Sequence, residues 1–189
     1  MKQSDKDIVE SILRGEEHGY SILLQRYRVR VYSLAFRIVR QREEAEEAAQ
    51  DAFVRAFRSL DHFEHRSRFS TWLYRITYNT ALTYAKRRGR QPTEAEQDDG
   101  DVATDEIPAD LRLERKELRD LAEAVIDNMR PEYATVLTLF YLQEQGYEEI
   151  AEITGTPLGT IKNRLHRARG QLRRAVLNKY SYVVEQDSQ

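Results

Sequence analysis

Cysteine is absent from this 189-residue chain, and glycine and proline are scarce, with eight and four residues. Without cysteine the chain can form neither a disulfide bond nor a thiolate metal site. The N-terminal residues contain no long apolar run, and no stretch approaches the roughly 18–20 apolar residues of a membrane span. We therefore expect no signal peptide and no membrane anchor, and the missing disulfides agree with a reducing, cytoplasmic compartment.

Period-two alternation of useful length is also missing, whereas apolar residues recur at helical spacing. Ser70 or Thr71 is placed to cap a helix that runs from Trp72 to about Arg88. Two earlier apolar stripes each predict an amphipathic helix: Tyr20, Leu23, Leu24, Tyr27, Val31, Leu34, Ala35 and Ile38, then Ala45, Ala48, Ala49, Ala52, Phe53, Ala56, Phe57 and Leu60. The sequence predicts an all-α fold.

Charge is divided unevenly along the chain, although the net charge is only −2. Residues 1–90 carry 18 bases against 12 acids, whereas residues 91–110 carry eight acids and no base. The 91–110 segment has no periodicity and is typical of a flexible acidic linker. We therefore predict two small helical domains, at 1–90 and 111–180, joined by this linker and followed by a tail at 181–189.

The stretch 147–174 has the form of a DNA-binding helix-turn-helix. A short helix at 147–154 is followed by a tight turn at Gly155, and Pro157 opens a long last helix. That helix turns Ile161 and Leu165 inward, and 158–174 holds six bases and no acid. Residues on its other face are of types that read base edges in the major groove: Thr160, Lys162, Asn163, Arg164, His166 and Arg167.

Three arginines further along this helix, Arg169, Arg173 and Arg174, are candidates for phosphate contacts. The alternative for the whole stretch is an ordinary amphipathic helix with a basic, solvated face. Against that alternative, a surface helix usually mixes charges of both signs to gain pairs four residues apart.

A second nucleic-acid signal lies between Arg55 and Arg90, where aromatic residues are interleaved with nine bases. Aromatic faces stack on unpaired bases, so this composition predicts a surface for single-stranded DNA. The alternative is that the rings belong to the core. The candidate contacts are Phe63, His65, Arg66, Ser67, Phe69, Trp72 and Asn79.

An acidic helix at 43–60 turns a third set of side chains, on its non-alanine face, away from the core: Glu47, Gln50, Asp51, Val54 and Arg58. A solvated charged face is the plain interpretation. A hydrolase using these carboxylates is an alternative, but no nucleophile or phosphate loop accompanies them. The four histidines show no ligand spacing. We therefore expect no catalytic residue, no metal and no cofactor.

Three motifs in this order, REEAEEAAQDAFVRAFRSLDHF, RFSTWLYRITYNTALTYAKRRGR and YEEIAEITGTPLGTIKNRLHRARGQLRRAV, resemble the extracytoplasmic-function sigma factors of the sigma-70 family. The resemblance covers nearly the whole chain except the linker and the last ten or so residues. It implies a subunit that joins core RNA polymerase and directs promoter-specific initiation. A helix-turn-helix regulator that never joins polymerase is the alternative.

The resemblance also implies a role for each set of candidate residues. The helix with Glu47 and Arg58 matches the one that docks on the clamp helices of the largest polymerase subunit, with the polymerase flap as a further contact. The 63–79 set matches the part that captures the melted minus-ten element, and the 160–167 set matches the reader of the minus-thirty-five duplex. An anti-sigma factor is the expected inhibitor. Gly170 departs from the family and is expected to end the rigid part of the last helix early.

Overall fold

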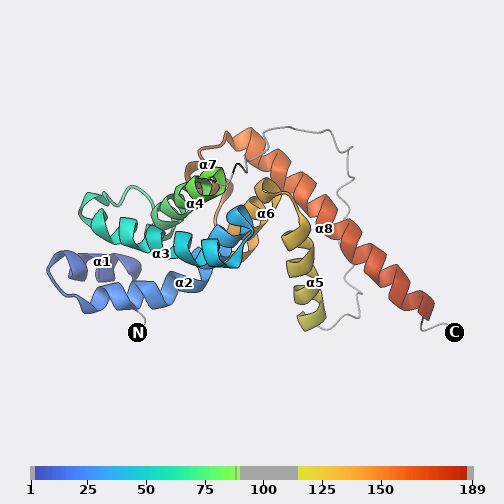
Figure 1. Ribbon diagram of the computed structural model, residues 1–189, viewed down its shortest axis with the longest axis horizontal. Helices are drawn as coiled ribbons and strands as arrows, with labels where there is room; N and C mark the ends of the chain where they lie inside the picture. Colours follow the sequence, from blue (N-terminus) through green and yellow to red (C-terminus); the bar gives the residue numbers. More distant parts are fainter. Residues whose placement is uncertain (1–2, 88, 90–114, 187–189) are drawn as a thin grey trace.

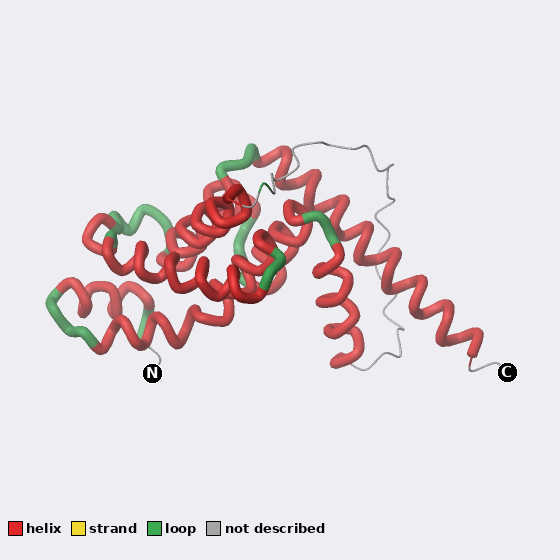
Figure 2. Tube along the Cα trace, viewed as in Figure 1, coloured by secondary structure: helices red, strands yellow, loops and turns green. Residues whose placement is uncertain are grey.

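The computed structural model describes residues 3–87, residue 89 and residues 115–186 (Figure 1). All regular structure in these ranges is helical, and the described residues contain no β-strand (Figure 2). The predicted all-α class is therefore confirmed. The predicted acidic linker at 91–110 lies outside the described residues. None of the described helices is both long and apolar enough to cross a membrane.

The N-terminal part consists of α1 (Asp5–Leu13), α2 (His18–Val39), α3 (Arg42–Arg58), a single 3₁₀ turn (Leu60–His62) and α4 (Phe69–Arg87). Helices α2, α3 and α4 pack against one another in pairs, and α1 packs on α2. Four alanines of α3 are fully buried, which lets its neighbours approach closely: Ala45, Ala48, Ala52 and Ala56. The two predicted stripes thus form the core of this part.

Close packing of two helices also explains how α1 is positioned on α2. Ser4 caps α1, because its hydroxyl accepts a hydrogen bond from the amide of Asp7 at 3.2 Å, and the Ser4 amide in turn donates one to the Asp7 carboxylate. Gly19 of α2 leaves room for α1, because a Cβ atom at this position would lie 2.5 Å from Cγ1 of Ile12. Helix α1 is therefore fixed over the first turns of α2.

The C-terminal part consists of α5 (Arg115–Asn128), α6 (Pro131–Leu137), the π-helical turn η2 (Thr138–Leu142), α7 (Tyr147–Thr154) and α8 (Leu158–Gln186). Helix α7 ends at Gly155, which has a φ of 65°, a left-handed conformation that glycine adopts without strain. The core of the C-terminal part is formed by side chains that are almost completely buried: Leu137, Leu139, Ile150, Ile153, Ile161 and Leu165.

Three local predictions are wrong. Leu24 is 43% exposed, so it lies at the edge of the α2 stripe rather than in the core. Ser70 and Thr71 do not cap α4, because the helix begins before them at Phe69. Gly170 does not end α8, which continues to Gln186 with Gly170 buried against the domain. Burial at Gly170 explains why a residue without a side chain is tolerated inside a helix.

The two parts are packed together rather than held apart. Helix α7 lies against α4, and α6 with the following turn lies against α2 (Figure 1). This brings the helix-turn-helix alongside the helix that carries the predicted single-strand contacts.

Candidate nucleic-acid interface and the contact between the two domains

The loop before α4 is built around three aromatic rings. Phe63 and Phe69 are buried, and their ring centroids lie 5.9 Å apart. Trp72 is only half-buried and lies 5.1 Å from Phe63 and 5.8 Å from Phe69. The structure therefore divides the predicted rings: Phe63 and Phe69 form the support, and Trp72 keeps a face toward solvent on which a base can stack.

The loop side chains themselves point outward. His65 is exposed, has a positive φ of 55°, and lies with its ring 4.6 Å from that of Phe63. Arg66 is exposed and pairs with Glu64 at 2.8 Å. Ser67 is half-buried, and Asn79 is exposed in the middle of α4, about three turns after its start at Phe69. The predicted single-strand set thus lies on one loop and the start of α4, with Asn79 further along the same helix.

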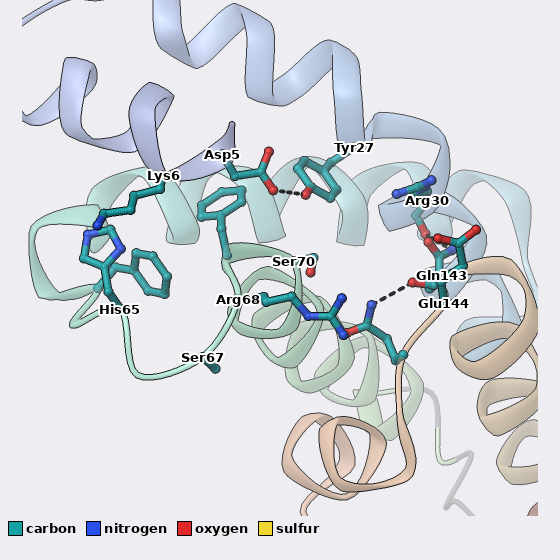
Figure 3. A pocket seen from close by; sticks show the side chains of 13 residues that line it. Asp5, Lys6, Tyr27, Arg30, His65, Ser67, Arg68, Ser70, Gln143 and Glu144 are labelled. Atoms are coloured by element: carbon teal, nitrogen blue, oxygen red, sulfur yellow. Dashed lines mark hydrogen bonds between the residues drawn. The ribbon is translucent and has the colours of Figure 1, made fainter. Parts of the chain in front are cut away.

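A cavity of about 460 Å³ opens beside this loop (Figure 3). Three cationic side chains from three different elements line it, Lys6 of α1, Arg30 of α2 and Arg68 of the loop, together with the carboxylates of Asp5 and Glu144. The buried rings of Phe63 and Phe69 form part of its wall. Such a lining combines an apolar surface for a planar group with charged groups of both signs, the cations being in slight excess.

The wall of the cavity is held by a network of buried phenols. Tyr27 donates a hydrogen bond to Asp5, and its ring contacts those of Phe69 and Tyr74 at 5.6 and 6.1 Å. Tyr74 donates to the side-chain oxygen of Gln143 at 2.9 Å. Burial raises the pKa of Tyr74 to about 12, so this phenol remains a hydrogen-bond donor across the physiological range. The network therefore ties α1, α2 and α4 to the C-terminal part.

The predicted polymerase-binding face lies on α3. Glu47, Gln50 and Arg58 are exposed, and Val54 is 46% exposed among them. Asp51 is half-buried and accepts a hydrogen bond from the Tyr84 hydroxyl of α4 at 2.8 Å. Sequence reasoning missed Tyr84 as a residue that orients this face.

The predicted duplex-reading residues lie on the first half of α8. Lys162 and Asn163 are exposed, and the others are half-buried: Thr160, Arg164, His166 and Arg167. Arg164 lies near Tyr78 of α4, where its charge acts against the effect of burial, which raises the Tyr78 pKa. One member of the predicted duplex-reading set thus lies near the first domain, while Lys162 and Asn163 remain exposed.

The predicted phosphate contacts have different surroundings. Arg169 lies over the rings of Phe140 and Tyr141, with centroid distances of 4.9 and 5.6 Å, and donates hydrogen bonds to the hydroxyls of Tyr141 and Tyr147. This arrangement links α8 to η2 and α7 within the domain. Arg174 is exposed and Arg173 is half-buried.

A bidentate ion pair joins the two domains beside the cavity. The guanidinium of Arg68 donates from Nε to Glu149 of α7 at 2.7 Å and from its terminal nitrogen to the other carboxylate oxygen. Burial opposes ionisation of Glu149, but hydrogen bonds from Arg68, the Gly146 amide and Thr71 outweigh it and lower the Glu149 pKa. The pair is therefore charged at neutral pH, and its contribution is lost as the pH falls through that lowered pKa.

Two further polar contacts cross between the domains. Arg40, at the left-handed C-cap of α2, donates to the carbonyl oxygens of Asp127 and Met129 at the end of α5, and Arg37 pairs with the Asp127 carboxylate. Cations at a helix C-terminus complement the unpaired carbonyls there. No pattern in the sequence pointed to these residues, because the partners lie about 90 positions apart.

Groups of three or more histidines, cysteines or carboxylates that could hold a metal ion were sought in the described ranges, and none was found.

The chain matches two family models, sigma-70 region 2 over residues 23–91 and sigma-70 region 4 over residues 119–172. It is 35% identical over 186 residues to the RNA polymerase sigma-H factor of Pseudomonas aeruginosa, covering 93% of this chain and 95% of the relative. It is 37% identical over 175 residues to the ECF RNA polymerase sigma-E factor of Escherichia coli K12, covering 88% and 91% of the two chains.

Two solved structures share its fold. A structure of CnrH in complex with the cytosolic domain of CnrY has a TM-score of 0.63 at 20% identity, covering 94% of this chain and 99% of that chain. The sigma factor RpoE in complex with the anti-sigma factor NepR from Bartonella quintana has a TM-score of 0.60 at 23% identity, covering 83% and 96%. With curated relatives above 30% identity aligned over nearly its full length, the chain belongs to the extracytoplasmic-function group of the sigma-70 family of RNA polymerase sigma factors.

Proposed function

We propose that this sigma factor binds core RNA polymerase through α3, reads the minus-thirty-five element as duplex through α8, and captures the minus-ten element as single strand on the loop before α4. The single observation that carries the proposal is the pairing of two nucleic-acid surfaces of different chemistry in one sigma-70 chain. One is an aromatic platform with an adjoining cationic cavity, and the other is a helix-turn-helix with a basic reading face.

Strand separation in this scheme needs no catalytic group. The aromatic loop binds only unpaired bases, so its binding energy favours the open form of the promoter over the duplex. We accordingly assign no enzymatic activity, cofactor or metal to the chain. In this proposal residues 1–90 form the domain that captures the minus-ten strand, and residues 111–180 form the domain that reads the minus-thirty-five duplex. Residues 91–110 are the linker between them.

The polymerase contact is assigned to the α3 face, to the clamp helices of the largest subunit and, from the second domain, to the flap. The mix of exposed acids with the exposed Val54 supports a protein partner, since a purely solvated face does not need an apolar side chain. An anti-sigma factor is the proposed inhibitor, because a solved relative of the same fold is bound to one. Because core polymerase is the proposed partner, we also propose that the chain acts in the cytoplasm.

Run-off transcription with purified core polymerase and a promoter library tests the proposal directly. We expect specific transcripts only when the chain is added, and a shared pair of upstream elements among the selected promoters. Tight promoter binding by the chain alone, without co-purification with core polymerase, would instead establish a helix-turn-helix regulator that never joins polymerase.

Replacing Lys162 and Arg164 with alanine tests the reading of the upstream element. Because a good side-chain contact to a base edge is worth about 1–3 kcal/mol, we expect each change to relax preference at one or two promoter positions. Selection from a library randomised around the upstream element measures this. A uniform loss across all sequences, with a shallower salt dependence, would make both residues phosphate contacts. Asn178→Ala, at an exposed site later in the same helix, is the matched control.

A further inference from the structure

Arg68 was not among the candidate contacts named from the sequence, yet it forms a bidentate ion pair between the domains. Its guanidinium grips both oxygens of the Glu149 carboxylate, and the hydroxyl of Thr71 lies 3.2 Å from one of them. The Arg68 side chain is 61% exposed, whereas that of Glu149 is 23% exposed. The acid therefore sits in a site that the first domain provides, and the arginine remains accessible from solvent.

The geometry of this site suits a phosphodiester as well as a carboxylate. A planar guanidinium fork binds two oxygens held on one atom, and carboxylate and phosphate groups both present such a pair. Thr71 adds one hydroxyl donor, whose single hydrogen is shared between Glu149 and the Gln145 side chain at 3.1 Å. The site is thus a cationic fork with a flanking hydroxyl, which Glu149 fills in this structure.

The position of the fork points to the identity of the second ligand. Arg68 is one residue from Ser67 and Phe69 and lines the same cavity as the loop (Figure 3), and it shares the partner Glu149 with Thr71. A strand whose bases stack on this loop carries a phosphate at every nucleotide, so its backbone passes close to the fork. Helix α7 lies across the expected course of this strand backbone, because α7 and α4 are in contact.

Glu149 is held beside Arg68 by more contacts than their ion pair. Tyr74 donates to Gln143 and Arg40 donates to the end of α5, so α6 and α7 are fixed against the first domain at separate points. Because both domains belong to one chain, Glu149 competes with an external anion at a high effective concentration.

We propose that Arg68 and Thr71 form a binding site for a backbone phosphate of the melted promoter strand, and that Glu149 occupies this site as an acidic stand-in when the two domains are closed. This inference rests on the proposed single-strand function of the loop. It adds a phosphate ligand to that loop and a competition between the two reading domains.

The experiment uses the full chain without polymerase and a fluorescein-labelled single-stranded 12-mer of random sequence. Glu149→Gln keeps the hydrogen bond to the Gly146 amide, because glutamine also serves in a capping box, but removes the charge. We expect this variant to bind the 12-mer about two- to fivefold more tightly, the range expected for releasing a partly exposed pair. The salt dependence of binding should steepen by about 0.7 in slope, which corresponds to one added phosphate contact.

Glu148→Gln is the matched control, since Glu148 is the exposed acid next in sequence on the same helix. Arg68→Gln in the Glu149→Gln background should abolish the gain, and Arg75→Gln, which removes an exposed cation from α4, should have a smaller effect. An equal gain from Glu148→Gln and Glu149→Gln would reduce the effect to net charge and overturn the inference. So would unchanged binding when Arg68→Gln is added to Glu149→Gln.

Failure here is distinguishable from failure of the proposed function. Run-off transcription tests initiation with polymerase, whereas this measurement uses the chain and a strand alone. Specific transcripts together with a flat Arg68 result would remove the phosphate site and leave the sigma-factor reading intact.

Discussion

Trp72→Ala is expected to reduce open-complex formation by roughly five- to a hundredfold, because stacking of one base on an aromatic ring is worth about 1–3 kcal/mol. Binding to the upstream duplex should change little, since that contact belongs to α8. Permanganate reactivity of promoter thymines in a complex with core polymerase measures the melted strand. Arg66→Ala on the same loop should act in the same direction, because Arg66 is exposed and pairs with Glu64 of the same loop.

Trp72 also packs on Phe63 and Phe69, so loss of the ring removes some support for the loop. Trp72→Phe separates the two roles, because it keeps a stacking face and most of the packing. We expect it to retain the greater part of open-complex formation. Unchanged thymine reactivity in both Trp72→Ala and Arg66→Ala would exclude the loop as the strand-capturing element.

Leu165→Ala is expected to destabilise the second domain by about 2–5 kcal/mol, because Leu165 is fully buried and truncation leaves a cavity among the packed helices. Duplex binding should fall with the folded fraction of the domain rather than at particular promoter positions. Hydrogen exchange of the α7 and α8 amides is the appropriate measurement, since a two-domain chain does not give a single free energy of unfolding.

Asn178→Ala serves as the control for this change, because it lies at an exposed site of the same helix and should stay within about 0.5 kcal/mol. Faster exchange in α2 and α3 as well would reveal that the stability of the first domain depends on the second. Protection equal to that of the unaltered chain would contradict the assigned core of the helix-turn-helix.

Helices that are flanked by glycine or marked by a clear apolar period could be predicted closely from the sequence. Helix α7 was predicted with the bounds that the structure has, because Gly146 and Gly155 flank it and glycine at 155 permits the left-handed turn. The alanine stripe of α3 and the helical class followed from periodicity in the same way. The proposed duplex-reading surface lies on α8, whose start was predicted at Pro157 and is found at Leu158.

Features that depend on contact between the domains could not be predicted. Thr71 looked like a helix cap, but its hydroxyl reaches Gln145 and Glu149 across 74 and 78 positions. The same limit holds within the second domain, where Arg169 was predicted as a phosphate contact from its place in a basic run, and the aromatic rings around it belong to segments that no local pattern brings together. Charge alone does not say whether an arginine meets an acid, a ring or a phosphate.

The number of residues in the π-helical turn at Thr138–Leu142 affects the orientation of everything that follows it. A π turn holds about one residue more than an α turn, so it changes the direction in which every later residue leaves the helix. The turn absorbs one extra residue, so inserting a further residue there would rotate Gln143 by about 100° around the axis, away from Tyr74. The way in which the two halves of this chain meet therefore depends partly on the number of residues in this turn. Substitutions do not change that number, whereas a single inserted residue does.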